Sequence, residues 1–79
     1  MAPTVVRDGP FRHFFLSREE PGMHVHVAHP DGEAKFWLEP RVELAGHAGL
    51  SQKELVAAEE VVIRHLQEIT HAWNKHFGA

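Results

Sequence analysis

Three histidines in the first half of the chain have the type and spacing to do chemistry. His24 and His26 are two residues apart in the run Met23–Val27, so on a β-strand their side chains share one face. Two imidazoles on one face chelate a zinc ion if His13 or a carboxylate supplies a third ligand. No other cluster of His, Asp or Glu has a recognised spacing. The competing interpretation, which we favour, is that both histidines pack against neighbours or contact a partner and hold no metal.

The same region also fits an acid–base ribonuclease. Cleavage of RNA through its own 2′-hydroxyl needs a general base, a general acid and a cation at the phosphate. His13, His24 and His26 supply the base and the acid. Lys35 and Arg12 supply the cation, and Trp37 supplies a ring on which a base can stack. The formal net charge of −3 argues against this function, because strong nucleic-acid binders usually carry a basic excess. We therefore expect no nucleic-acid binding by this chain alone.

Length and composition limit what can position these groups. The 79 residues make a single domain, residues 1–79, with ordinary apolar (43%) and charged (24%) content. The absence of cysteine excludes disulfides and thiolate metal sites. The chain contains no long apolar run. We expect a cytoplasmic protein that makes no contact with a membrane.

The first part of the chain, residues 1–45, has the pattern of an antiparallel sheet. Short β-branched or aromatic runs alternate with Gly and Pro. A meander of about four strands is the simplest topology because every connection is short. A further run, Val42–Ala45, predicts either a last short strand or a single helical turn. The four expected strands are Thr4–Arg7, Phe11–Ser17, Met23–His29 and Glu33–Leu38.

The second part, residues 51–78, has the pattern of one long helix packed on one face of the sheet, which makes the fold α+β. Ser51 and Glu54 form a capping-box pattern, and Gly78 ends the helix. At 1.5 Å per residue the helix is roughly 39 Å long, whereas a compact domain of this size is about 30 Å across. The helix is therefore expected to overhang the sheet or to be covered by a partner. Its apolar arc consists of Leu55, Val56, Val62, Ile63, Leu66, Ile69, Thr70, Trp73 and Phe77.

The turn after His29 leaves two hairpin registers open. A four-residue loop pairs Val27 with Phe36, which gives an apolar face for the helix and leaves His24 and His26 on the outer face. A three-residue loop with a bulge puts the two histidines among the apolar side chains instead. The hydrophobic pattern favours the four-residue loop.

In the favoured register, Phe14 and Leu16 point inward and the outer face becomes a patch of rings and cations. Exposed patches of this kind usually mark a binding surface. We therefore predict that this face binds a partner. Its members are Phe11, His13, Phe15, His24, His26, Lys35 and Trp37.

Several motifs occur together over nearly the whole chain. They are Pro3–Arg7, Phe14–Phe15, His24–Val27, Ala34–Leu38, Val42–Ala45, Ser51-x-x-Glu54-Leu55 and Ala72-Trp73-Asn74-x-x-Phe77-Gly78. In this combination the chain resembles the bacterial domain-of-unknown-function 4160 family. The resemblance implies a stand-alone cytoplasmic protein, often encoded beside a second small protein in a toxin–antitoxin-like pair. It implies no established activity.

The sequence therefore predicts a non-catalytic protein-interaction module, one member of a toxin–antitoxin-like pair. Its partner would be a protein encoded nearby or a second copy of the chain. The alternative is a small histidine-dependent ribonuclease or metal-binding enzyme that uses His13, His24, His26 and Lys35, with zinc at His24 and His26 as the one cofactor considered.

Overall fold

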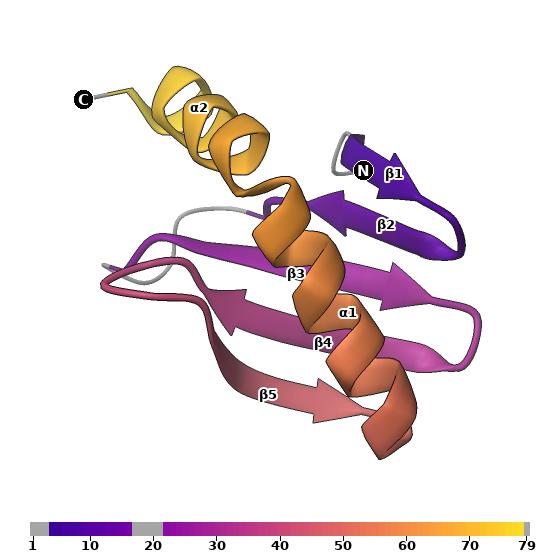
Figure 1. Cartoon of the computed structure of the whole chain (residues 1–79). Helices are drawn as coiled ribbons and strands as arrows, with labels where there is room; N and C mark the ends of the chain where they lie inside the picture. Colours follow the sequence, from indigo (N-terminus) through magenta and orange to yellow (C-terminus); the bar gives the residue numbers. More distant parts are fainter. Residues whose placement is uncertain (1–3, 17–21, 79) are drawn as a thin grey trace.

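The protein folds as a five-stranded sheet accompanied by two helices (Figure 1). The computed structural model describes residues 4–16 and 22–78. Ser17, the last residue of the second expected strand, lies outside the described residues. The elements are β1 (Thr4–Asp8), β2 (Phe11–Phe14), β3 (His24–His29), β4 (Gly32–Trp37), β5 (Glu43–Ala48), α1 (Gln52–Arg64) and α2 (Leu66–Phe77).

The strands lie in the order β1-β2-β3-β4-β5, and each pairs antiparallel with the next. The predicted α+β class and the meander topology are confirmed. The predicted number of about four strands is too low, because the ambiguous run after Pro40 forms β5 and extends the sheet to Ala48. The sequence signal for β5 was weak, since small residues such as Gly46 have low strand propensity.

The β3–β4 hairpin has a tighter turn than either predicted register. His29 pairs with Gly32, which leaves a two-residue turn, and Val25 pairs with Phe36. The favoured register was therefore wrong by two residues. A shift of two preserves the alternation of side chains, so the valines and Phe36 still share the buried face. Gly32 permits the close approach of β5 at the start of β4, because a Cβ there would overlap the backbone carbonyl of Ala48.

The first helix begins at the predicted capping box. The Glu54 amide donates to the Ser51 hydroxyl oxygen at 3.2 Å, and the Ser51 amide donates to the Glu54 carboxylate at 2.8 Å. These two bonds satisfy amide donors that have no partner within the helix. At the other end, Gly78 follows α2 with a φ of 71°, as its position predicted.

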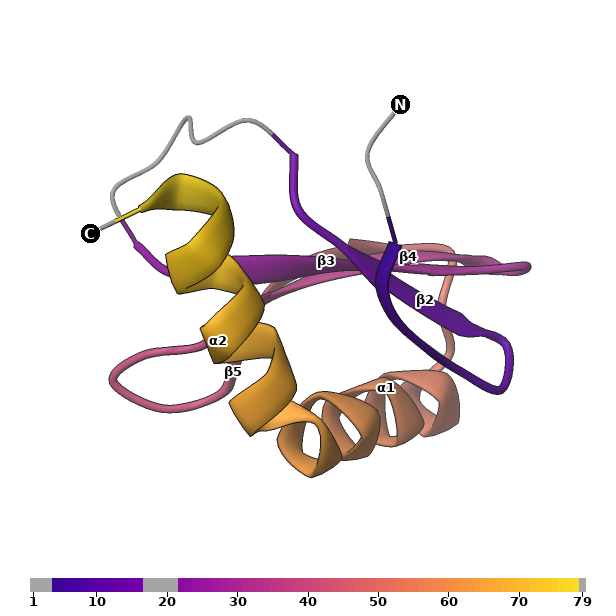
Figure 2. The same ribbon diagram turned by 90° about the horizontal axis from the view of Figure 1, so that it is seen from above.

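The predicted single helix is instead two helices that meet at His65. This residue has φ −106° and ψ 19°, outside the α-helical region. The bend turns α2 away from the line of α1 (Figures 1 and 2), and α2 contacts β1. The longest dimension of the molecule is 35 Å, and the single helix of roughly 39 Å, on which the expected overhang or covering partner rested, does not exist. The bend allows α2 to bury its apolar side on the protein's own sheet.

The core lies between the sheet and the helices, with Val25, Val27 and Phe36 fully covered. Two members of the predicted apolar arc, Val56 and Ile63, are instead 50% and 54% exposed. Leu16, expected inward, is also exposed. The buried apolar residues are Val6, Phe11, Phe15, Val25, Val27, Ala34, Phe36, Leu38, Leu50, Ala58, Val61, Val62, Ile69 and Trp73.

Candidate functional site

The outer face of the sheet, the face away from α1, carries a ladder of rings and cations. Phe14 pairs with His26, and His26 pairs with Lys35 on the next strand. The Phe14 and His26 rings stack with their centroids 5.6 Å apart. The Lys35 ammonium lies 4.7 Å from the centre of the Trp37 ring. The Arg12 guanidinium lies 4.4 Å from the centre of the Phe14 ring. His26, Lys35 and Trp37 are thus on the face predicted for them.

Three other residues predicted on the outer face, Phe11, His13 and Phe15, are buried on the helix side. His13 pairs with Val27, so the two share the inner face. The predicted parity of β2 was wrong by one residue because both alternating sets of side chains in this segment contain aromatic rings. Packing selects the set that includes Phe15, whose ring lies 5.3 Å from that of Trp73.

His24 has the outer-face parity but is only 1% exposed. The Trp73 ring from α2 lies 5.2 Å from the His24 ring, and the Trp37 ring lies 5.9 Å from it. Its Nδ1–H donates to the Gly22 carbonyl at 2.8 Å. The expected solvent-facing pair of histidines is therefore wrong for His24, because α2 bends around the end of β3 and covers it.

The alternative catalytic residues do not converge. His13 lies on the inner face of the sheet, and His26 and Lys35 lie on the outer face. His24 is buried under α2. The His24 and His26 rings are 5.3 Å apart. Among the described residues, no Asp or Glu joins these two histidines in a group of three metal-ligand atoms. The zinc site considered for this pair therefore lacks a third ligand in that part of the chain.

A hollow of 260 Å³ opens beside β5. His26 and Lys35 line it from β3 and β4, and Gly46, which pairs with Lys35, lines it from β5. A Cβ on Gly46 would meet nothing within 4 Å, so the missing side chain contributes to the hollow. The ladder thus ends at a recess next to the last strand of the sheet.

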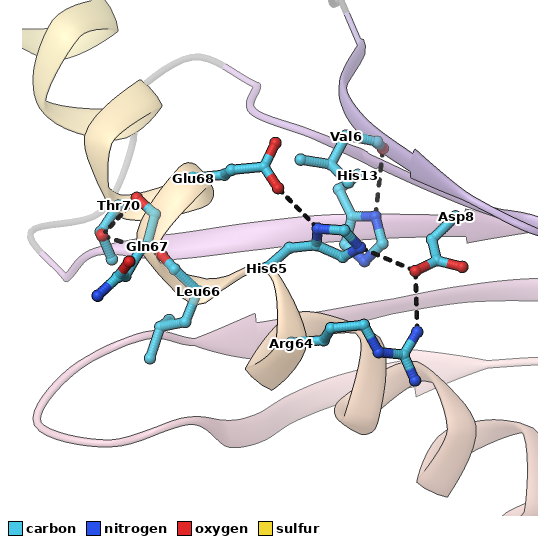
Figure 3. Close-up of polar contacts among 9 residues, drawn as sticks. All are labelled: Val6, Asp8, His13, Arg64, His65, Leu66, Gln67, Glu68 and Thr70. Carbon is cyan, nitrogen blue, oxygen red and sulfur yellow. Dashed lines mark hydrogen bonds and ion pairs between the residues drawn. The ribbon is translucent and has the colours of Figure 1, made fainter.

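A second polar cluster holds the bend between the helices against β1 (Figure 3). The Asp8 carboxylate, at the end of β1, accepts hydrogen bonds from Arg64 at 2.9 Å and from His65 Nε2–H at 2.8 Å. His65 Nδ1–H donates to the Glu68 carboxylate at 2.8 Å. Since carboxylates accept, both ring nitrogens of His65 carry protons. Hydrogen bonds to Glu68 and then to Asp8 raise the pKa of His65 accordingly.

His13 lies beneath this cluster and has no exposed surface. Its Nδ1–H donates to the Val6 carbonyl at 3.2 Å, which leaves Nε2 as a lone-pair acceptor with no hydrogen-bond partner among the described residues. Burial lowers the pKa of His13, and the charge of His65 lowers it further. His13 is therefore held in its neutral form.

Sequence reasoning did not find the His65 cluster. Its one local signal is the spacing of three between His65 and Glu68, which places them on one helical face. Asp8 is 57 residues away from His65 in the chain, and only the bend between the helices brings them together.

The comparison with protein families gives one match, which spans residues 11–74 and so most of the chain. The matching model is described as a domain of unknown function, DUF4160. The chain belongs to the DUF4160 family. The matched region of this DUF4160 domain begins with β2 and ends within α2. No curated protein and no solved structure is similar enough to count as a match. In the described part of the chain, neither helix has the length and apolar character needed to cross a membrane.

Proposed function

We propose that this DUF4160 domain is a non-catalytic protein-interaction module that receives an extended segment of a partner protein as a sixth strand beside β5. The observation that carries the proposal is the exposure of β5: all six of its residues are exposed, and it is the last strand of the sheet. The opposite edge strand, β1, is packed by α2. An uncovered edge presents backbone N–H and C=O groups that a second chain can pair with.

The composition of β5 supports this interpretation. Edge strands are usually protected from other chains by Lys, Pro or a bulge. The sequence of β5, Glu43–Ala48, contains neither Lys nor Pro. It has one irregularity, at Ala45, between the pairs that Leu44 and Gly46 make with β4. Regular pairing continues from Gly46 to Ala48, and this stretch is where a partner strand has a flat edge to follow.

The hollow beside β5 supplies a means of selection. In strand addition, main-chain hydrogen bonds provide affinity, and pockets for alternate side chains provide specificity. A strand added to β5 places every second side chain on the outer face, next to the recess lined by His26, Lys35 and Gly46. The volume of 260 Å³ suits a single side chain of the partner.

The other face of an added strand would meet apolar surface. Leu44 pairs with the buried Phe36, so it is on the helix side of the sheet, and it is exposed. Apolar residues at the alternate positions of the partner segment would cover this surface, which water contacts in the free domain.

The resemblance that places the chain in its family also indicates the kind of partner. A second small protein, the other member of a toxin–antitoxin-like pair, is the occupant to which we commit. Of the residues predicted to bind a partner, His26, Lys35 and Trp37 remain on the outer face of the sheet, which we propose as part of the binding surface. Phe11, His13, Phe15 and His24 act as packing residues beneath it.

Hydrogen–deuterium exchange of the full chain tests the proposal. The probe is a peptide selected on the immobilised domain from a displayed library of random dodecapeptides. Peptide binding is expected to slow the exchange of the Glu43–Ala48 amides, because the added strand bonds to them. Slowed exchange confined to α1 or β1 would overturn the proposal, and so would failure of the library to yield any binder.

A matched pair of variants sharpens this test. Gly46→Val fills the recess, and the fold tolerates it because the added Cβ meets open space. It is expected to weaken peptide binding by about tenfold. Glu60→Val adds the same side chain at an exposed position of α1 and is expected to leave binding unchanged. Equal effects of the two variants would contradict a site beside β5.

The ribonuclease alternative finds no comparable support, because its residues lie on both faces of the sheet. It is tested by incubating total RNA with the wild-type protein and with His26→Ala, each with added zinc and with EDTA. RNA cleavage that disappears in the variant would favour the enzyme over the interaction module.

A further inference from the structure

From the geometry at the tip of the β3–β4 hairpin, we infer that His29, Asp31 and Glu54 form a binding site for a divalent transition-metal ion of the zinc class. His29 ends β3, Asp31 occupies the turn, and Glu54 is in the first turn of α1. This inference is independent of the proposed function. The site involves neither the His24 and His26 pair nor the hollow beside β5.

Three ligand atoms converge at this point. His29 Nδ1 lies 3.9 Å from an Asp31 carboxylate oxygen and 3.9 Å from a Glu54 carboxylate oxygen. All three atoms lie within 4.8 Å of one another, and in the described part of the chain no other three His, Asp or Glu residues bring their ligand atoms so close. One imidazole and two carboxylates form a donor set that zinc and manganese accept.

His29 Nδ1 is in the form that can ligate a metal ion. The Asp31 backbone amide donates a hydrogen bond to Nδ1 at 3.0 Å, so this nitrogen has a lone pair and not a proton. Because Nδ1 has only this one lone pair, a bound ion would replace the Asp31 amide as its partner.

The distances fit zinc after a small adjustment. A tetrahedral zinc with bonds near 2.1 Å needs neighbouring ligand atoms about 3.4 Å apart, roughly half an ångström less than the 3.9 Å from His29 Nδ1 to each carboxylate oxygen. The Asp31 side chain is 61% exposed, so it can move and also leaves the ion a path of entry. Three protein ligands leave the fourth position open to water.

The surrounding backbone holds the three ligands in place. One oxygen of Glu54 accepts from the Ser51 amide in the capping box, which leaves the other oxygen facing His29. Gly49, with a φ of 83°, is so close to the turn that a Cβ would overlap the Asp31 carbonyl. The positive end of the α1 dipole opposes a cation here, so we expect a dissociation constant on the order of micromolar rather than nanomolar.

The test is isothermal titration of the full chain with zinc chloride near neutral pH, together with NMR of the chain titrated with Mn²⁺. One zinc per chain is expected, and paramagnetic broadening is expected around residues 29–31 and 51–54. Asp31→Asn and Glu54→Gln should each weaken zinc binding by about tenfold or more. Glu54→Gln keeps an acceptor for the Ser51 amide, so loss of the helix cap does not explain its effect.

Two controls separate this site from adventitious binding. His71→Gln removes an exposed imidazole of α2, and Glu60→Gln removes an exposed carboxylate of α1; neither should change zinc affinity. The proposal is overturned if zinc produces no binding heat, if manganese broadens resonances elsewhere, or if either control weakens binding as much as Asp31→Asn does.

Discussion

His65, at the bend between the helices, interacts electrostatically with the buried His13, and the pKa values of the two residues are displaced in opposite directions. Burial lowers the pKa of His13 and keeps it neutral. Hydrogen bonds to Glu68 and Asp8 raise the pKa of His65 and keep it charged. His13 is neutral while His65 is charged only at pH values between the folded pKa of His13 and the folded pKa of His65. The pH dependence of folding stability should therefore have a maximum near pH 6.5, the unperturbed pKa of histidine (about 6.5).

Replacing His65 is expected to flatten the decline of stability on the alkaline side. The folded pKa of His65 is above the unfolded value, so its contribution is complete below about pH 6.5 and disappears as pH rises through the folded pKa. His65→Gln loses that dependence. Urea unfolding of the wild type and of His65→Gln at several pH values above neutral measures how the free energy of unfolding depends on pH. His71→Gln, which changes an exposed imidazole, should keep the wild-type slope, and a wild-type slope in His65→Gln would refute the prediction.

Replacing His13 is expected to flatten the decline on the acid side. The folded pKa of His13 is below the unfolded value, so its contribution is complete above about pH 6.5 and is lost as pH falls toward the folded pKa. His13→Leu removes the titrating group together with the unpaired Nε2 atom. The free energy of unfolding should then vary less between about pH 6.5 and pH 5. Urea unfolding measures this. If the stability of His13→Leu declines toward acid pH as much as that of the wild type, another group causes the decline.

Removing the Trp73 ring is expected to destabilise the protein by about 3–5 kcal/mol. This ring packs against Phe15, Phe77 and His24, with a centroid separation of 4.2 Å from Phe77. Trp73→Ala leaves a cavity at the point where α2 covers the end of β3. Asn74→Ala, at the next and exposed position, should change stability by less than about 0.5 kcal/mol. Urea denaturation measures both, and similar losses would mean that α2 is not packed as described.

Adding one methyl group at Gly49 is expected to cost about 1–3 kcal/mol. Gly49 has a positive φ, and its Cβ would overlap the Asp31 carbonyl. Gly46→Ala is the matched control, because a Cβ there meets open space and its φ is ordinary. It should be close to neutral or slightly stabilising. Thermal unfolding of the two variants decides the matter, and a Gly46→Ala variant as unstable as Gly49→Ala would contradict the hairpin geometry.

Local sequence patterns predicted the buried face of a strand or the end of a helix correctly where only one interpretation of the pattern was possible. Alternation in β3 and β4 predicted that Val25, Val27 and Phe36 share the buried face, and this held although the register was wrong by two residues. The capping box at Ser51 and the end of α2 at Gly78 were also predicted from the sequence. Each of these features depends on residues only a few positions apart, whose geometry the backbone dictates.

The face of β2 and the break at His65 required the tertiary structure. Aromatic residues occupy both parities of β2, so the choice between Phe14 and Phe15 as the buried ring was made by Trp73, far along the chain. The helical pattern runs through His65 without interruption, and the break follows from the burial that α2 gains on the sheet and from the hydrogen bond to Asp8.

The sequence alone determined the α+β fold class and the family, and it supplied the histidines and carboxylates of the chain. The structure decided which of them meet. It separated His13 from His26 by the thickness of the sheet, enclosed His24 under α2, and brought Glu54 to His29 across a distance of 25 residues in the chain. The physical reason is that side-chain alternation and helix caps are local properties of the backbone. Contacts between distant residues depend instead on how the whole chain best buries its apolar surface.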